Sequence, residues 1–468
     1  MIRSRLTHLA LAIPLTLAGC ALGPDYSRPT AALALPDSYG AATTATPAEA
    51  PALSSRWWTL FGDHQLDQLV DQALTSSPDA RSAAARIEEA DAVLRQVDAA
   101  LLPQVDASAG VSRARTILPT SIEPTGLLRN INRIGLSTSF ELDVWGKLRR
   151  ASEGARAQAL GTRYTSETVA LSLAASVSQA YLNLRAIDAQ LLATRDTVSS
   201  QTESARLTQA RFKGGIASQL DVEQAEGALA SYTAALAQLE KSRGLAENLL
   251  GLLVGQPGLK LAPGDLKTLP VPPVPPAGLP SSLLESRPDL RKAETDLIAA
   301  NARIGVAKAA LFPSLTLTGS FGRESRELSD LFSGNAAVWS VGAGLTQPIF
   351  EGGRLRAQVD AVTAQQKQTL ESYRKSVQTA FKEVNDALIS VRQNGEAEDA
   401  LSRAMSAAQR GLQLARARYD SGYSPYLDVL TAQRTANEAT LAWVQNRQAR
   451  LGATVDLFKA LGGGWKGS

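Results

Sequence analysis

The segment RFKGGIASQLDV, residues 211–222, recurs 207 residues later as RYDSGYSPYLDV, residues 418–429. In both copies an arginine and an aromatic residue precede a glycine-containing break, and a Leu-Asp-Val triplet follows it. Because glycine permits the left-handed backbone of a tight turn, each copy predicts a turn between two helices. The repetition predicts that the chain consists of two related halves.

Other blocks return in the same order along the chain. Residues 77–81, 101–103, 146–149 and 250–255 match 287–291, 311–313, 353–356 and 457–462. We therefore predict a first repeat over 57–255, a second over 281–463 and a short tail, 464–468. The segment 256–280 holds eight of the 22 prolines, so we expect a stiff linker that is not helical.

Each half has the pattern of a helix, two strands, a very long helix, a turn and a final helix. Residues 147–211 contain no proline and would form a helix on the order of 100 Å long. Apolar residues recur every seven positions, which is typical of coiled coils; an ordinary helical bundle differs mainly in length. These positions are Leu184, Leu191, Val198, Ala205 and Phe212, then Val377, Val384, Val391, Met405, Leu412 and Tyr419, with Glu398 as the polar break.

After Pro103 and Pro313 the apolar period changes to two, which predicts strands. They are expected at about 104–113, 132–143, 314–322 and 338–347. Each is near the length that crosses a bilayer at a tilt, although a half-buried sheet of a soluble protein gives the same alternation. The segments 113–131 and 323–337 would then be extracellular loops.

A four-stranded membrane sheet imposes a physical requirement on the chain. Four strands cannot close a barrel of useful bore, and an open sheet exposes unpaired amides to hydrocarbon. The chain would therefore share its barrel with copies of itself. Three copies would give twelve strands, although this argument does not by itself distinguish a trimer from a dimer or a tetramer. The fold class expected is an α+β membrane protein with a long coiled-coil periplasmic barrel below the strands.

The N-terminus has the pattern of a bacterial lipoprotein signal. Residues 1–19 contain two arginines and a short apolar run that ends in LAGC, so cleavage would leave Cys20 first. We expect this cysteine to carry an S-diacylglycerol and an N-acyl lipid, which anchor the chain. An ordinary signal peptide with an incidental cysteine is the alternative. Residues 20–56 would form an extended, poorly ordered tether.

Composition excludes several classes of function. The 48 Lys+Arg against 45 Asp+Glu argue against a nucleic-acid binder. The chain has two histidines and one cysteine; after cleavage of the signal one histidine remains and the cysteine is the first residue. This excludes a His/Cys metal cluster, a Cys-His catalytic pair and an internal disulfide. A carboxylate pair such as Asp221 and Glu223 lacks a supporting nucleophile. We therefore expect no enzyme, no metal and no cofactor other than the lipid.

From Cys20 to about Gly463 the chain resembles the TolC-like outer membrane factors, in their lipoprotein branch. The marks are the GPDY segment after the cysteine, the two Leu-Asp-Val triplets, the repeat order and the start of the first repeat, Trp57, Trp58, Phe61 and Asp63. The resemblance implies a homotrimer in the cell outer membrane. It also implies docking to a periplasmic adaptor protein and an inner-membrane pump, of the RND type.

The function implied is a passive exit duct for small molecules in a tripartite efflux system. The alternative is a periplasmic coiled-coil lipoprotein that acts as a spacer or adaptor. Adaptors usually have one hairpin and lack a duplication of the whole chain, which favours the duct.

The two glycine-containing breaks are the candidate docking tips. By resemblance, Gly215, Ile216, Ala217 and Ser218 in the first half, with Gly422, Tyr423 and Ser424 in the second, would contact the adaptor. The alternative is that they are turns and nothing more. Apolar Ile216 and Tyr423 on exposed tips favour docking.

Asp428 and Asp221 are the candidate gate residues. Three copies around an axis would bring carboxylates together in a cation-selective ring; stabilisation of a helix N-terminus is the alternative. In the similar channels an aromatic residue and an arginine bind the first-repeat aspartate. Tyr419 matches the aromatic residue, whereas Ser424 stands where the arginine is expected. Trp145, Trp339 and Phe350 would lie at the membrane interface or pack where strands meet helices.

Overall fold

The chain, represented by a computed structural model, is described for residues 21–29, 39, 54–118, 125–274 and 283–464. The expected signal peptide and Cys20 lie outside the described residues. The chain forms two compact units, and the two longest helices take part in both. One unit comprises residues up to 30, 87–163 and 292–374; the other comprises 31–86, 164–291 and 375–468.

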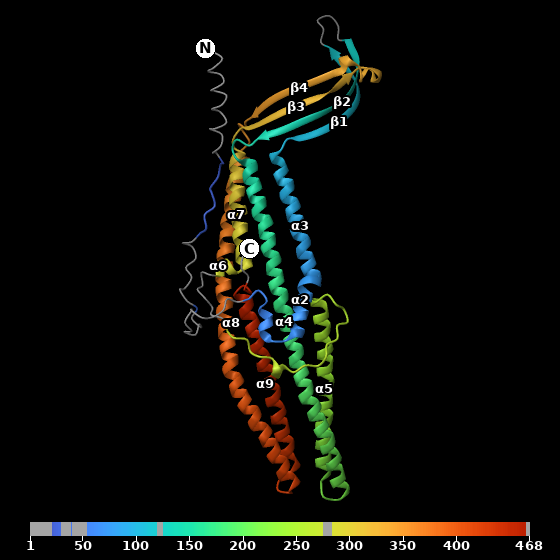
Figure 1. Cartoon of the computed structure of the whole chain (residues 1–468), viewed down its shortest axis with the longest axis vertical. Helices are drawn as coiled ribbons and strands as arrows, with labels where there is room; N and C mark the ends of the chain where they lie inside the picture. The colour runs from blue at the N-terminus through green and yellow to red at the C-terminus, as the bar shows by residue number, and fades with distance from the viewer. Residues whose placement is uncertain (1–20, 30–38, 40–53, 119–124, 275–282, 465–468) are drawn as a thin grey trace. The chain divides into compact units, whose positions relative to one another are not determined.

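The longest elements are α4 (Lys147–Lys213) and α8 (Arg354–Asp420), with 67 residues each (Figure 1). At 1.5 Å per residue, such a helix is about 100 Å long, as expected from residues 147–211. A short turn follows each one and leads into α5 (Gln219–Leu253) or α9 (Tyr426–Ala460). Both halves therefore contain the long helix, turn and second helix that the repeat predicts.

Shorter helices precede the strands in each half. Pro78 and Pro288 begin α3 and α7. Proline is favoured at a first helical position because the backbone N–H that it lacks would have no partner within the helix. Before them, Asp63 caps α2 by accepting from the backbone N–H groups of Gln65 and Leu66. The elements are η1 (Trp57–Phe61), α2 (His64–Ser76), α3 (Pro78–Asp98), η2 (Ala99–Leu101), η3 (Leu266–Thr268), α6 (Leu283–Ser286) and α7 (Pro288–Ala309).

The first unit contains an antiparallel sheet in the order β1-β2-β3-β4 (Figure 1). β2 and β3 come from different halves and pair directly, with Leu136 opposite Phe321. Within the described residues β1 and β4 each pair on one side only, so each offers a free row of backbone groups to another strand. The strands are β1 (Gln104–Leu118), β2 (Thr125–Leu142), β3 (Ser314–Ser325) and β4 (Ala337–Thr346).

The strands extend further than the apolar alternation predicted. In the expected loop 113–131, β1 and β2 continue to pair, with Arg113 opposite Asn130 and Arg115 opposite Leu128. That loop prediction is wrong, because backbone hydrogen bonds hold a ladder together whether or not apolar side chains continue to alternate. The segment 323–337 likewise begins in β3 and holds two short turns, η5 (Leu328–Asp330) and η6 (Gly334–Ala336).

The core of the second unit contains heptad positions of α4. Leu184 and Leu191 are 0% and 2% exposed, and they pack in one cluster with aromatic residues from both ends of the chain, including Trp57 and Phe458. Closer to the turns the same heptad becomes only half-buried, as at Val198, Ala205, Met405 and Leu412. A single chain therefore leaves part of its apolar stripe uncovered near the turns.

Glu398, the polar break in the heptad, is the partner of two arginines. Its carboxylate accepts from Arg447 at 2.7 Å and from Arg450 at 2.9 Å, and its side chain is only 10% exposed. Arg447 also donates to the backbone carbonyl of Leu269 in the linker, at 2.6 Å. The break is therefore a buried ion-pair site that fastens the linker to the second half.

The first half holds the same linker through buried charges. Arg243 donates to the carbonyl of Leu261 at 2.7 Å, and the N–H of Gly264 donates to Asp188 at 3.0 Å. The N–H of Leu261 donates to Glu247 at 3.1 Å. Up to residue 274, where its description stops, the linker is thus bound by both halves.

None of the described helices combines the length and the apolar character needed to cross a membrane.

Candidate functional site

The two breaks quoted from the sequence lie at helix–helix turns of the second unit. After α4, the N–H of Ile216 donates to the carbonyl of Arg211 at 2.8 Å, and Gly215 has φ of 72°. After α8, the N–H of Tyr423 donates to Arg418 at 2.8 Å, and Gly422 has φ of 79°. A side chain at either glycine would meet open space, so the positive φ is what requires glycine.

The apolar residue at each tip is almost fully exposed. Ile216 is 82% exposed and Tyr423 is 80% exposed. Ala217 and Ser424 are half-buried beside them, and Ser218 is exposed. The tips therefore present two large apolar side chains outward, as the docking prediction requires.

The two candidate gate aspartates have different surroundings. Asp221 lies in a capping box: its carboxylate accepts from the N–H of Ser218 at 3.0 Å, and the Ser218 hydroxyl accepts from the Asp221 N–H at 3.2 Å. Asp428, in the first turn of α9, is exposed, and no described residue bonds to its carboxylate. Asp221 is thus engaged in holding a helix end, while Asp428 is available for other contacts.

Tyr419 contacts an arginine from the other hairpin. The guanidinium of Arg211, in the last turn of α4, lies 4.7 Å from the centre of the Tyr419 ring. Arg211 also pairs with Asp420 at 3.8 Å. No hydrogen bond joins Tyr419 to Asp221 among the described residues, although the resemblance pairs these two positions. The arginine at this contact comes from the first half, whereas Ser424 occupies the position expected for it.

Two further contacts join α4 to the second hairpin. The hydroxyls of Tyr426 and Ser204 lie 2.9 Å apart, and Arg416 donates to Ser200 and Gln433. Burial raises the pKa of Tyr426; the hydrogen bond with Ser204 opposes this rise, and electrostatic repulsion from Tyr419 adds to it. The hydroxyl of Tyr426 therefore stays protonated and can serve as a donor.

Sequence reasoning did not assign Arg211, Arg416, Ser204 or Tyr426. The repeated Arg-aromatic pair before each break was a signal for Arg211. The sequence held no signal for Ser204 and Arg416, because their contacts depend on how α4 packs against α8 and α9.

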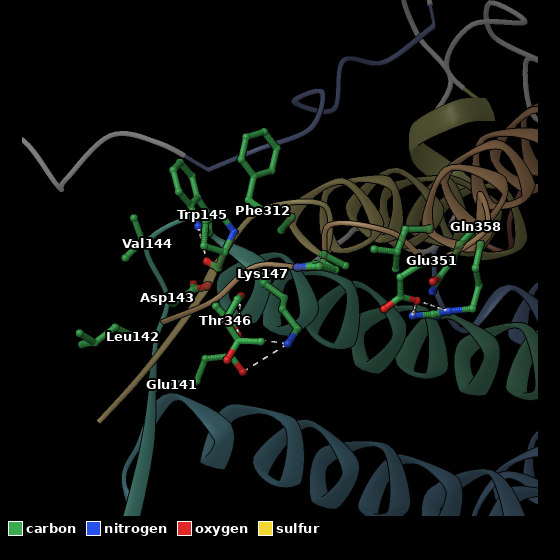
Figure 2. A pocket seen from close by; sticks show the side chains of 17 residues that line it. Glu141, Leu142, Asp143, Val144, Trp145, Lys147, Phe312, Thr346, Glu351 and Gln358 are labelled. Carbon is green, nitrogen blue, oxygen red and sulfur yellow. Dashed lines mark hydrogen bonds and ion pairs between the residues drawn. The ribbon is translucent and has the colours of Figure 1, made fainter. Parts of the chain in front are cut away.

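The first unit holds a cavity of about 460 Å³ where strands meet helices (Figure 2). Trp145 and Phe312 lie together at its wall, with ring centres 4.9 Å apart, and the Trp145 indole N–H donates to Pro313 at 2.8 Å. Lys147 pairs with Glu141 at 3.0 Å. Arg354 pairs with Glu351, whereas Asp143 pairs with Arg149 outside the lining. Trp145 packs at the junction of strands and helices.

The other two aromatic residues of the membrane-interface prediction are exposed. Trp339 is 76% exposed on β4, and Phe350, just after that strand, is 89% exposed. Among the described residues, no group of three or more His, Cys, Asp or Glu side chains could hold a metal ion.

The described part of the N-terminal tether is bound to the helices. The N–H of Leu22 donates to the carbonyl of Trp145 at 3.0 Å, and Asp25 pairs with Arg150 at 2.6 Å. The backbone of Ala21 leaves no room for a side chain on Gly146. Residues 21–29 contain no helix or strand and bend at Gly23, where φ is 103°. Polar groups on α4 and α7 hold this part of the tether in place.

Glu294 on α7 holds the far end of this segment. Its carboxylate accepts hydrogen bonds from Nε and Nη2 of Arg28, each at 2.7 Å, and from the Tyr26 hydroxyl at 3.1 Å. Burial raises the pKa of Tyr26, and the charge of Glu294 adds to the effect. Residues 26–28 are therefore held against α7.

Comparisons with known proteins cover almost all of the chain. The family model described as outer membrane efflux protein matches residues 69–256 and 279–463. The toluene efflux pump outer membrane protein TtgF of Pseudomonas putida is 38% identical, over 98% of this chain and 97% of its own length. The outer membrane protein OprJ of Pseudomonas aeruginosa is 36% identical, over 97% of this chain and 95% of its own length.

A solved structure supports the same relationship. The outer-membrane channel OprN has a TM-score of 0.87 and 30% sequence identity, and the match covers 95% of this chain and 99% of that chain. The matched region thus includes both halves of the chain, with the strands and the tips described above.

Proposed function

The chain belongs to the outer membrane efflux protein family, and on that premise we propose that three copies form the passive exit duct of a tripartite pump. Members of the family are outer membrane channels of efflux systems, so the predicted function, location and α+β fold class are confirmed. The alternative of a periplasmic spacer or adaptor is set aside, because the similarity spans the whole chain.

The main observation in support of a homotrimer is the open sheet. β1 and β4 pair on one side only among the described residues, and an unpaired edge in hydrocarbon costs several kcal/mol per backbone group. Pairing β4 of one copy with β1 of the next removes both edges, and three copies supply twelve strands. The half-buried heptad stripe near the tips has the same explanation, since neighbouring copies would cover it.

The lipid anchor belongs to this proposal. Cys20 would carry the S-diacylglycerol and the N-acyl chain, and Ala21 lies against Gly146, between β2 and α4. The anchor would therefore enter the membrane next to the strands of its own chain. Several acyl chains together give stable attachment, whereas one alone is reversible.

Asp428 is the proposed gate residue. Its carboxylate is exposed in the first turn of α9, and no described residue neutralises it. Three such carboxylates around one axis would attract cations and repel anions. Asp221 would contribute to the gate indirectly, by fixing the first tip through its capping box, and Tyr419 would do so through Arg211.

The exposed tips are the proposed adaptor-docking surface. Ile216 and Tyr423 present apolar side chains with no core to cover them, a pattern that marks interaction sites. The inner-membrane partner would be a pump of the RND type, which supplies the energy. We assign the duct no catalytic chemistry, so cargo would pass unchanged; TtgF, by its name, serves the efflux of toluene.

Native mass in mild detergent tests the proposal. The mature protein is extracted from outer membranes and its mass is measured after correction for bound detergent. A mass three times that of the chain supports the shared barrel. A monodisperse monomer, or release from the membrane when the lipid is removed, contradicts it.

A further inference from the structure

The cavity of about 460 Å³ in the first unit lies at the level where the membrane strands give way to helices (Figure 2). β2 ends at Leu142, β3 begins at Ser314 and β4 ends at Thr346, and all three residues line the cavity. Because the strands cross the outer membrane, this end of the sheet lies at one surface of the bilayer. The polar layer at that surface consists of phospholipid headgroups.

The exposed side chains change from apolar to charged at the same level. Val341 and Leu345 on β4 are 81% and 69% exposed, as lipid-facing residues of a barrel strand are. Ile349 and Phe350 follow the strand and are each 89% exposed. The next residue, Glu351, is charged and lines the cavity. The apolar band therefore ends, and the headgroup layer begins, beside this cavity.

Two ion pairs place charges of both signs in the lining. Lys147 pairs with Glu141, and Arg354 pairs with Glu351; all four residues line the cavity. The side chain of Lys147 is 41% exposed and that of Arg354 is 63% exposed. A lysine ammonium has three N–H donors and an arginine guanidinium has five. Both cations therefore retain donors for a ligand.

Most of the remaining lining is apolar. Trp145 and Phe312 form an aromatic wall, with ring centres 4.9 Å apart. Ligand pockets have volumes of about 300–1,000 Å³ and combine an apolar lining with a few polar groups; this cavity has both properties. A phosphate is a strong acceptor for lysine and arginine, and an ammonium group is a donor for carboxylates. The matching ligand is a zwitterion attached to an apolar body.

We propose that this cavity binds the headgroup of a phospholipid with a primary amine, of the phosphatidylethanolamine class. The phosphate accepts hydrogen bonds from Lys147 and Arg354, and the ammonium donates to Glu141 and Glu351. A choline headgroup has no N–H to donate to these carboxylates. The bound lipid links the end of the sheet to the first turns of α4 and α8. The inference rests on the outer-membrane location and not on the number of copies in the barrel.

Native mass spectrometry of the delipidated mature protein in mild detergent measures lipid binding. The protein is titrated separately with phosphatidylethanolamine, phosphatidylcholine and phosphatidylglycerol. We expect one phosphatidylethanolamine per chain to bind most tightly, because the other two headgroups lack the N–H donors of a primary ammonium. Free phosphoethanolamine at the same concentration should not displace the lipid, since it lacks the apolar body. Equal displacement would mean that the site takes a soluble phosphate compound, and would overturn the proposal.

Removing one cation should weaken the binding of phosphatidylethanolamine. Arg354→Gln should raise its dissociation constant by about fivefold, because one basic residue near a membrane surface contributes about that much. The matched control is Arg374→Gln on the same helix. Arg374 pairs with Glu371 at the same three-residue spacing but does not line the cavity. Equal dissociation constants for the two variants contradict the assignment of Arg354 to the phosphate.

The carboxylates are tested through headgroup preference. Glu141→Gln should reduce the preference for phosphatidylethanolamine over phosphatidylcholine, because it removes an acceptor for the ammonium. The unaltered protein keeps the test independent of whether the variants fold: equal affinity for the three lipids overturns the proposal. The same spectra report the number of chains. A trimer without lipid preference therefore refutes this inference and leaves the proposed duct intact.

Discussion

The guanidinium of Arg211 lies over the ring of Tyr419, 4.7 Å from its centre, and pairs with the adjacent Asp420 at 3.8 Å. One arginine at the end of α4 therefore contacts two consecutive residues at the end of α8. Because these helices belong to different halves, the contact holds one hairpin tip against the other, and separating the tips must break it.

Removing Arg211 should make the closed tips less stable. A cation–π contact at an exposed site contributes about 0.5–1 kcal/mol, and an exposed ion pair about 0.2–1 kcal/mol. Arg211→Ala should raise the open probability in single-channel recordings by roughly twofold to tenfold. The control is Arg206→Ala, because Arg206 pairs with Glu203 on its own helix. Equal open probabilities for the two variants would refute a role for Arg211 in closure.

Neutralising Asp428 should change ion preference. Asp428→Asn removes an exposed carboxylate that has no described partner, so we expect a weaker preference for cations in reversal-potential measurements across a salt gradient. Asp221→Asn should leave the reversal potential nearly unchanged and instead lower stability by about 0.3–1 kcal/mol, because it removes a negative charge from the N-terminus of α5 and weakens the bond donated by the Ser218 N–H. The opposite pattern, with selectivity lost in Asp221→Asn alone, would mean that the gate assignment is reversed.

The linker contact at Glu247 should make stability depend on pH. Burial alone raises the pKa of this carboxyl, but hydrogen bonds from Lys260, from the Leu261 N–H and from Arg243 outweigh it, so the pKa lies below its ordinary value of 4.5. A group whose pKa is lower in the folded state stabilises fully above its unfolded pKa, and this contribution is lost as pH falls through the folded pKa.

Glu247→Gln isolates that contribution. The variant should be less stable than the unaltered protein at pH 7, and the difference should shrink as the pH falls below about 4.5. Thermal unfolding followed by circular dichroism at several pH values measures it. Glu226→Gln is a suitable comparison, because Glu226 is exposed on the same helix. A gap between Glu247→Gln and the unaltered protein that widens on acidification would contradict the expected sign.

Glu294 should control access to the N-terminal segment. Glu294→Ala removes the acceptor of Arg28 and Tyr26, so residues 21–28 should detach more often from α7. We expect limited chymotrypsin to cut after Tyr26 several-fold faster, since cleavage follows the detached population. Asp296→Asn on the same helix, where Asp296 pairs with Lys292, is the control. If both variants are cut at the same rate, Glu294 does not hold the segment.

The helical part of the fold was predictable because its signals are periodic. Seven-residue spacing places Leu184 and Leu191 on one face of a helix, and the structure buries both. The strand ends were less predictable, since Arg113 and Arg115 interrupt the apolar alternation while the backbone ladder continues. Glu398 looked like a defect in the heptad because its partners, Arg447 and Arg450, come from another helix.

The sequence by itself determined the duplication, the two long helices, the alternating strands and the positions of the turns. All of these follow from spacing along the chain, through glycine at positive φ and apolar periods of 7 and 2. Only the tertiary structure decided which side chains meet at the tips, namely Arg211 with Tyr419 and Ser204 with Tyr426. Such contacts depend on how helices some 200 residues apart in sequence lie against each other, and no local pattern records that packing.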